Sequence, residues 1–553
     1  MRFQQLLIVF FLFVGSSAVL AGPPALNSCG DSNYVCTIDS NISSDQNWVD
    51  GNTYVILADV NVTGTGTDLN IAPGVVVKFG SGRNLIITDG GRLLANGTVD
   101  KNIFFVSCKD QNSFAGSTNA DTSSIPGCSG VIGRPDYNTA IFVKNPSGMA
   151  LSDSFSYIRI FDHNHGIFLD KNIASIHHSI FDHEPTYYLQ LGTPTILIKS
   201  SRATNLFDNQ FLSSDSTYVV IHSSGQFDGN IYNNNFVNMA YYGVQCGGGS
   251  YVPRCNSNVF NNRFSTTGLA RFGFFLSGIS MYGSIYNNFF EKTGIGGNES
   301  GSYYFGPIYN NLFIQGFISL AAHVYSPIEN NTFMNAGTAI GNNGSDWSGR
   351  IQRNLFAHTN TVLNGSFIGP VSHNAYFNVT TFGGAADDHN SDVNSQTGFT
   401  VDPFIGDGGD RNFMFNSDLN GGAKLVDAGN VDLNAFYLAR TTQYGNKLDV
   451  NKLDIGFHFD QNAPYVQVLS PSDSNSLTGE QSVDFNVESA FGSAANITAA
   501  LAYSTASSGS GTSILSQALS AFACSALPVA SCSYAWDTTS VTDGNYFVRL
   551  AGT

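Results

Sequence analysis

Two neighbouring segments carry the residues best suited to acid and base chemistry. Asp162 and His163 follow an aromatic residue, and Asp182 and His183 recur 20 residues later in the same tripeptide, Phe-Asp-His. If the two tripeptides occupy consecutive coils of a repetitive fold, their carboxylates and imidazoles form pairs, as general acid and base catalysis requires. The alternative is a polar ladder that closes a turn. The sequence favours this alternative, because nothing in it brings the four side chains to one cleft.

Aromatic residues form a second candidate site. They occupy the same place in five short blocks of sequence, and three of them are tyrosines, Tyr232, Tyr286 and Tyr309. An outward column of rings would form a stripe on which sugar rings could stack. The aliphatic residues in the same blocks favour an inward core stack instead. Both orientations stay open at this stage.

Cofactor and enzyme motifs are sparse. Acidic residues in Gly-rich loops, at 387–389 and 407–410, could hold calcium through oxygen ligands, but such loops usually bind nothing, so no cofactor is required. A metal site built from His163, His183 and a carboxylate is a lesser alternative, and we predict no metal ligands. The scattered Lys and Arg residues match no lyase motif, and the paired aspartates of polygalacturonase-like hydrolases are missing. Whether the protein is an enzyme therefore stays open.

A repeat indicates which elements would position these residues. Six-residue blocks such as IYNNNF at 231–236 recur every 20 to 28 residues, with apolar residues at both ends. Such short blocks between Gly, Ser and Asn predict strands, and a unit of variable length predicts a parallel β-helix. The fourth residue is always asparagine, which tolerates the left-handed bend at a corner and can bond its amide to the next coil. The predicted ladder comprises Asn209, Asn234, Asn262, Asn288, Asn311, Asn331, Asn354 and Asn374.

The flanks of the repeat carry further motifs. The stretches IAPGVVVKFG at 71–80 and GGRLLANGT at 90–98 precede it, and Asp-Pro-Phe at 402–404, LVDAG at 425–429 and LDIG at 453–456 follow it. In these segments the chain resembles the exported right-handed parallel β-helix repeat proteins, over roughly residues 50 to 460. This resemblance implies a fold and leaves the activity open, because the same architecture hosts lyases, hydrolases, epimerases and adhesins.

The C-terminal region has a different sequence pattern and lacks the repeat blocks. Short apolar runs alternate with turns after residue 463, and WDTTSVTDGNY at 536–546 is similar to the penultimate strands of bacterial Ig-like domains. One further strand would be expected after Thr553, so the last domain is predicted to be truncated.

The N-terminus and the cysteines predict the compartment. Residues 1–21 read as a signal peptide, and no second stretch is apolar and long enough to span a bilayer. An even number of cysteines in an exported chain predicts disulfides. Proximity suggests four pairs, Cys29 with Cys36, Cys108 with Cys128, Cys246 with Cys255, and Cys524 with Cys532. The net charge of −17 argues against a nucleic-acid partner.

The sequence thus predicts an all-β protein. A signal peptide (1–21) and an N-terminal cap (22–49) precede a right-handed parallel β-helix (50–462), and an Ig-like β-sandwich (463–553) follows. The protein is expected to be secreted or held at the cell surface and to engage extracellular polysaccharides or surface glycans. The alternatives are a polysaccharide lyase or glycoside hydrolase working in a groove of the β-helix, and a surface stalk without a ligand.

Overall fold

The computed structural model describes most of the repetitive region and part of the C-terminal region. The described residues are 35–115, 117, 119–130, 139–144, 154–161, 165–170, 175–182, 195–199, 204–213, 218–221, 226–239, 241–247, 254–266, 272–297, 302–321, 323–342, 347–383, 425–429, 440–441, 452–460, 465–470, 480–488, 498–504, 512–518, 520, 522–524, 529–539, 541 and 547–552.

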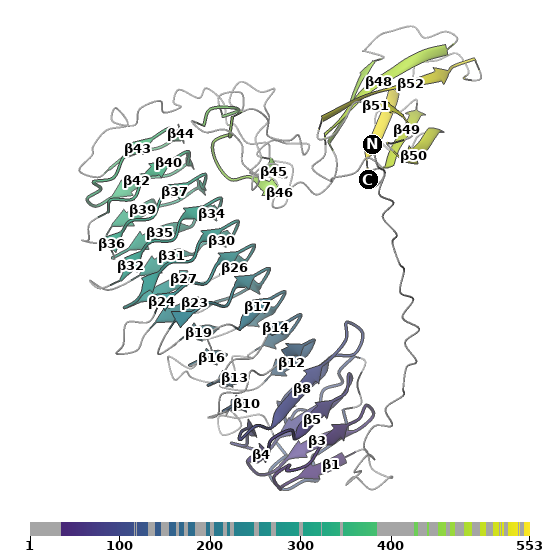
Figure 1. Cartoon of the computed structure of the whole chain (residues 1–553), viewed down its shortest axis with the longest axis vertical. Coiled ribbons are helices and arrows are strands. Elements are labelled where there is room, and N and C mark those ends of the chain that lie inside the picture. The colour runs from purple at the N-terminus through teal and green to yellow at the C-terminus, as the bar shows by residue number, and fades with distance from the viewer. Residues whose placement is uncertain are drawn as a thin grey trace, which may run out of the picture.

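Three long parallel sheets, A, B and C, run the length of the repeat (Figure 1). Sheet A comprises β1 (Val35–Ile38), β3 (Thr53–Ile56), β6 (Val76–Phe79), β9 (Ile103–Ser107), β12 (Ile158–Phe161), β15 (Ile180–Asp182), β18 (Gln210–Ser213), β22 (Asn235–Phe236), β26 (Arg263–Ser265), β30 (Phe289–Glu291), β34 (Leu312–Ile314), β38 (Thr332–Met334), β41 (Leu355–Ala357) and β44 (Ala375–Phe377). Sheet B comprises β4 (Val60–Val62), β7 (Leu85–Ile87), β10 (Thr139–Val143), β13 (His165–Leu169), β16 (Ile196–Ile198), β19 (Val219–Ile221), β23 (Tyr242–Gly247), β27 (Phe272–Ser277), β31 (Gly294–Gly297), β35 (Phe317–Leu320), β39 (Thr338–Asn342) and β42 (Thr361–Asn364).

Sheet C and a short sheet complete the coils. Sheet C comprises β2 (Gln46–Trp48), β5 (Asp68–Ile71), β8 (Arg92–Asn96), β11 (Ser154–Ser156), β14 (Ser175–His177), β17 (Asn205–Phe207), β21 (Ile231–Tyr232), β25 (Val259–Phe260), β29 (Ile285–Tyr286), β33 (Ile308–Tyr309), β37 (Ile328–Glu329), β40 (Ile351–Gln352) and β43 (Val371–Ser372). The short sheet comprises β20 (Gln226–Phe227), β24 (Arg254–Cys255), β28 (Ser280–Met281), β32 (Tyr303–Tyr304) and β36 (His323–Val324).

These sheets form a parallel β-helix, which confirms the predicted fold class. Each strand pairs in parallel with the equivalent strands of the coils before and after it, as β21 does with β17 and β25. The first strands, β1 and β2, belong to sheets A and C and come from the segment predicted to be a cap. Because consecutive side chains alternate between the two faces of a strand, each coil sends about every second residue inward.

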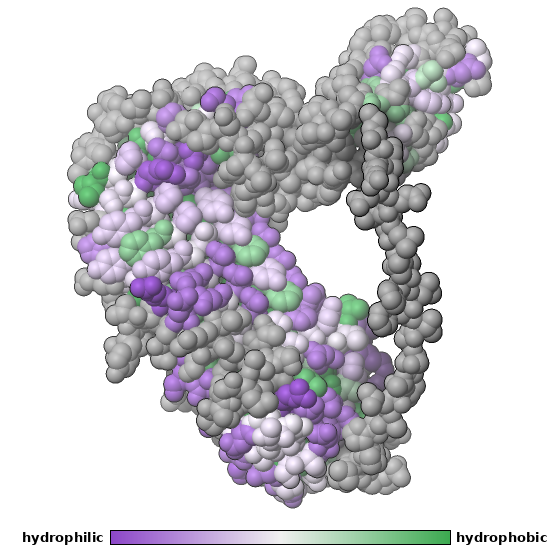
Figure 2. All heavy atoms as spheres, viewed as in Figure 1, coloured by the Kyte–Doolittle hydropathy of each residue, from purple (hydrophilic) through white to green (hydrophobic). Residues whose placement is uncertain are grey.

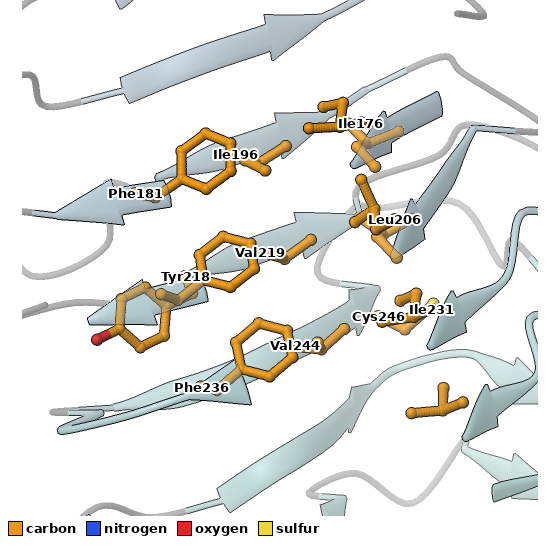
Figure 3. Packing of buried hydrophobic residues seen from close by; sticks show 14 of the residues in the cluster. Ile176, Phe181, Ile196, Leu206, Tyr218, Val219, Ile231, Phe236, Val244 and Cys246 are labelled. Carbon is orange, nitrogen blue, oxygen red and sulfur yellow. The ribbon is translucent and has the colours of Figure 1, made fainter. Parts of the chain in front are cut away.

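The core fills the space between the three long sheets. Figure 3 shows Ile176 of sheet C, Phe181 of sheet A and Ile196 of sheet B pointing into the same interior, with equivalent residues in the next coils. The sixth residue of each block forms a column of stacked rings inside the core, with centroids 4.6 to 5.6 Å apart. This core column comprises Phe211, Phe236, Phe264, Phe290, Phe313, Phe333, Phe356 and Tyr376, together with Phe181 of the coil before the first block.

The asparagine ladder is present as predicted. The Asn288 amide nitrogen donates to the Oδ1 of Asn311 at 3.0 Å, and the Oδ1 of Asn288 accepts in turn from Asn262 at 3.0 Å. The same side-chain bond links every neighbouring pair from Asn209 to Asn374. All eight asparagines are buried. The third residue of each block, just before the ladder, has a positive φ, as in Asn233 at 57°, so the bend lies one residue before the ladder asparagine.

The segment at 454–458, which follows the repeat, lies against the bend that the third residues of the blocks form. His458 donates its backbone N–H to Oδ1 of Asn310 at 2.6 Å and accepts from the Asn310 amide nitrogen at 2.9 Å. One coil further on, the Asn330 amide nitrogen donates to the carbonyl of Asp454 at 3.0 Å. The segment that follows the repeat, with the LDIG sequence, is therefore held to the β-helix by the amides of two corner asparagines.

The remaining strands lie outside the β-helix. A pair consists of β45 (Arg440–Thr441) and β46 (Phe459–Asp460). The C-terminal region contains β47 (Tyr465–Ser470), β48 (Glu480–Glu488), β51 (Ala523–Cys524) and β52 (Val529–Asp537) in one antiparallel sheet, and β49 (Thr498–Ser504), β50 (Thr512–Ala518) and β53 (Phe547–Gly552) in another. Residues from both sheets share one hydrophobic core, which is the arrangement of a β-sandwich.

Three predicted disulfides are formed, Cys108–Cys128, Cys246–Cys255 and Cys524–Cys532. Cys36 is also disulfide-bonded, and Cys29 lies outside the described residues. These bonds indicate an oxidising environment. Within the described ranges, no helix has the length and hydropathy needed to cross a membrane. The predicted signal peptide lies outside the described residues.

Lys78 anchors a loop over the outer face of sheet A. It lies on β6, is fully buried, and donates to the carbonyls of Asp110 at 2.7 Å and Ala120 at 3.0 Å and to Thr122 Oγ1 at 3.1 Å. Burial lowers the pKa of Lys78 to about 8, and the charges of Asp110 and Asp121 offset part of this shift.

This buried ammonium predicts a pH dependence of stability. The unfolded chain keeps the proton of Lys78 up to about pH 10.4, whereas the folded protein releases it near pH 8, so the unfolded state binds more protons between these values. We therefore expect the free energy of unfolding to rise by roughly 1 to 3 kcal/mol from pH 8 to pH 10. Urea unfolding at several pH values measures it. A Lys78→Met variant should lack this rise, and an equal rise in both proteins would contradict the assignment.

Candidate functional site: a ring column on sheet C

The second residue of each repeat block points outward. In β21 and its neighbours the first residue, such as Ile231, is fully buried, whereas the second, such as Tyr232, is partly exposed. The rings of these second residues stack in one continuous column with centroids 4.6 to 5.0 Å apart and interplanar angles of 2 to 8°. The column comprises Phe207, Tyr232, Phe260, Tyr286 and Tyr309, and His177 extends it from the coil before the first block.

The interpretation of this column as a core stack is therefore wrong. The aliphatic residues that suggested it occupy the first position of the block, and strand alternation places them on the opposite face. The sequence holds a signal that was missed. In the last blocks the second position is polar, namely Glu329, Gln352 and Ser372, while the first position stays Ile or Val. A position that accepts Glu, Gln and Ser in a repeat is an outward one.

The stacking also determines which part of each ring a ligand can contact. Each inner ring is covered on both faces by its neighbours, as Phe260 is by Tyr232 and Tyr286 at 4.9 Å. The column therefore presents ring edges, and a sugar ring cannot lie flat on it. Burial raises the pKa of the Tyr232 phenol, and the nearby charge of Asp208 raises it further, so this hydroxyl keeps its proton.

Side-chain amides border the ring column on both sides. On one side Asn205, Asn230 and Asn258 form a second ladder, in which the Oδ1 of Asn230 accepts the backbone N–H of Asn258 at 3.2 Å. On the other side lie the corner asparagines, of which Asn233 and Asn261 are exposed. At the coils of Tyr232 and Phe260, sheet C thus carries ring edges between amides on both sides.

An ionisable cluster lies at the N-terminal end of the column. The Nδ1 atoms of His177 and His178 are 2.8 Å apart, and Nε2 of His178 is 3.6 Å from a carboxylate oxygen of Asp208. Burial lowers the pKa of His177, and the neighbouring His178 lowers it further, while Asp208 acts in the opposite direction. His178 also stacks on Tyr157 with centroids 4.8 Å apart. The imidazole of His177 is therefore neutral near pH 7 and extends the ring column by one member.

The structure tests little of the predicted acid and base pair. Asp182 pairs in register with Phe161. Asp162, His163 and His183 lie outside the described residues, as do the acidic loops at 387–389 and 407–410. Among the residues described, no group of three or more His, Cys, Asp or Glu side chains could hold a metal ion.

A second set of stacked rings lies at the turn between the short sheet and sheet C. Tyr282 stacks on Phe305 with centroids 4.9 Å apart, and Phe305 on Tyr325 with centroids 5.3 Å apart. The guanidinium carbon of Arg254 lies 5.3 Å from the centroid of Tyr282 at one end of the stack. These three residues lie outside the repeat blocks that predict the β-helix, but each precedes the first residue of a block by three positions, which is a repeat signal in the sequence.

Comparisons with family models, with curated proteins and with solved structures find no match to this chain. The class of the protein therefore follows from its fold and surface. It is an all-β protein built on a disulfide-bonded parallel β-helix, with an outward column of stacked rings on sheet C.

Proposed function

We propose that this protein is exported and binds extracellular polysaccharides along sheet C of its β-helix. The observation that carries the proposal is the outward ring column between two rows of amides. Binding sites for sugars combine apolar surface with a small number of oriented polar groups. Here the ring edges supply the apolar surface, and the hydroxyls of Tyr232, Tyr286 and Tyr309 and the flanking amides supply hydrogen bonds.

The regular spacing favours a polymer over a small ligand. One ring recurs at each of six coils, and the six rings span about 24 Å along the axis. A linear glycan lying along the column meets one ring edge per coil, with amides on both sides at the coils of Tyr232 and Phe260. Each contact is weak, so the affinity depends on the number of sugar residues bound at once. We therefore expect the affinity to rise with chain length until the glycan spans the column.

The charge of the protein favours neutral glycans. The chain carries 41 acidic against 24 basic residues, so an acidic polysaccharide is repelled on approach. The same balance disfavours a lyase, which needs basic residues near a uronate carboxylate. Binding without cleavage is therefore the better interpretation.

Affinity electrophoresis tests this proposal directly. The disulfide-intact protein is run through gels that contain neutral or acidic polysaccharides, with and without calcium. We expect neutral polysaccharides to retard the protein. A Tyr232→Ser/Tyr286→Ser variant should lose most of this retardation, since two of the six rings and their hydroxyls are removed.

The control is a residue of sheet C at the equivalent position of a coil that carries no ring there. Gln352 occupies the second position of its block, two coils beyond the last ring, so a Gln352→Ala variant should be retarded as strongly as the wild type. Absence of retardation in every gel would refute the proposed function. Appearance of new reducing ends during the run would favour the hydrolase or lyase alternative.

A further inference from the structure

The turn before sheet C carries a column of side chains in strict register. The backbone N–H of Tyr282, Phe305 and Tyr325 each donates to a carbonyl of the preceding coil at 2.8 to 2.9 Å. Two further residues make the equivalent bond, Ser348 at 3.0 Å and Ile368 at 2.9 Å. These five residues, named the turn column, therefore occupy one position in five consecutive coils.

A tight turn directs the turn column outward. A glycine follows most of its members, and a Cβ atom at Gly306 would lie 1.9 Å from the carbonyl oxygen of Gly283. The exposed fractions are 42% for Tyr282, 41% for Phe305, 48% for Tyr325 and 72% for Ile368. These are four of the six large hydrophobic side chains that are exposed in the described part of the chain. Such a concentration of exposed apolar surface marks an interaction site.

The stack of rings has a gap at Ser348. Tyr282, Phe305 and Tyr325 form three consecutive layers about one coil apart. The next layer holds the small, exposed side chain of Ser348, and the layer after it holds Ile368. Two coils of about 4.8 Å each separate Tyr325 from Ile368, so these side chains lie about 10 Å apart along the axis, and the gap is the single layer between them. It has room for one flat ring at the spacing that the stack itself adopts.

We propose that this gap, the Ser348 slot, binds one pyranose residue of a neutral β-linked glucan. Among the described residues Tyr325 is the last ring of its stack, so no further ring covers its outer face, in contrast to the inner rings of the sheet C column. A pyranose with equatorial hydroxyls has apolar C–H groups on both faces, which pack against the Tyr325 ring on one side and Ile368 on the other. Its hydroxyls lie at the rim, in water or near the Ser348 hydroxyl. This inference rests on the proposed function and specifies its ligand class.

The experiment measures cellohexaose binding to the intact protein by isothermal titration calorimetry. Two variants address the slot. Tyr325→Ala removes the ring face, and Ser348→Tyr adds a ring that fills the gap from within the chain. We expect each to weaken binding about tenfold. Tyr282→Ala is the matched control, because Tyr282 lies at the far end of the same stack, and it should change the affinity less than twofold. Melting temperatures verify that each variant folds, and Tyr325→Ser replaces any variant that does not.

The outcomes separate this inference from the proposed function. If the wild type binds cellohexaose and the slot variants bind it as tightly, the slot is refuted and glycan binding stands. If the wild type binds only acidic polysaccharides, the slot is again refuted while the general function stands. If the wild type binds no glycan in either assay, both fail. Selective loss in the two slot variants, with Tyr282→Ala unaffected, is the expected result.

Discussion

Replacing Asn288 with alanine is expected to lower the free energy of unfolding of the β-helix by about 3 to 5 kcal/mol. The Asn288 amide nitrogen donates to the carbonyls of Val259 and Tyr286 and to Oδ1 of Asn311, at 2.8 to 3.0 Å. Its Oδ1 accepts from the backbone N–H and the side chain of Asn262, both at 3.0 Å. Alanine removes all five hydrogen bonds and leaves their buried donors and acceptors in neighbouring residues unpaired. The free-energy cost of these unpaired groups exceeds the net stabilisation that the five bonds provide.

The measurement is thermal or urea unfolding followed by circular dichroism. Asn311→Ala should have a similar effect, and the double variant should lose less than the sum, because the two side chains share a hydrogen bond. The control is Asn233→Gly, which removes an exposed corner amide and keeps a residue that tolerates a positive φ. We expect this control to change stability by less than about 0.5 kcal/mol. An Asn288→Ala variant as stable as this control would disprove the role of the ladder.

The second large effect is expected for Phe313→Ala, at about 3 to 5 kcal/mol. Phe313 is fully buried in the core column, where it stacks on Phe290 at 4.8 Å and on Phe333 at 4.6 Å. Truncation leaves a cavity that the rigid stack of coils cannot close, because the strand spacing fixes the positions of the neighbouring rings.

Tyr309 in the same coil provides the matched comparison. It stacks on Tyr286 at 5.0 Å, much as Phe313 stacks on Phe290, but it faces outward. Tyr309→Ala should therefore cost only about 1 kcal/mol, since water fills the space that the ring leaves. Equal losses of stability in the two variants would contradict the assignment of one ring to the core and of the other to the surface.

Parts of the proposed binding surface were predictable from the sequence and parts were not. The residues Tyr232, Tyr286 and Tyr309 were predicted to share one column, because the repeat places them at the same position of consecutive coils. Whether they face inward or outward stayed open. The apolar residues at both ends of the block hid the alternation, although the polar residue at Glu329 in the same position marks the outer face.

The register of Asp182 shows a limit of predictions from sequence offsets. The two Phe-Asp-His tripeptides are 20 residues apart, but the sheet pairs Arg159 with Ile180 and Phe161 with Asp182, an offset of 21. A shift by one residue in a strand moves a side chain to the other face. The register of each strand depends on the residue at which it begins after the preceding loop. Because loop length varies from coil to coil in this chain, a sequence offset alone does not determine the register.

By itself, the sequence determined the parallel β-helix, the asparagine ladder and three disulfide pairings, because each depends on one residue type recurring at a fixed place or on cysteines close in the chain. Only the tertiary structure decided which rings face outward, that the rings of sheet C expose their edges, and that the turn column has a gap at Ser348. These properties depend on the register between coils and on which side chains the preceding and following coils place at the same position. A single coil of sequence does not contain that information.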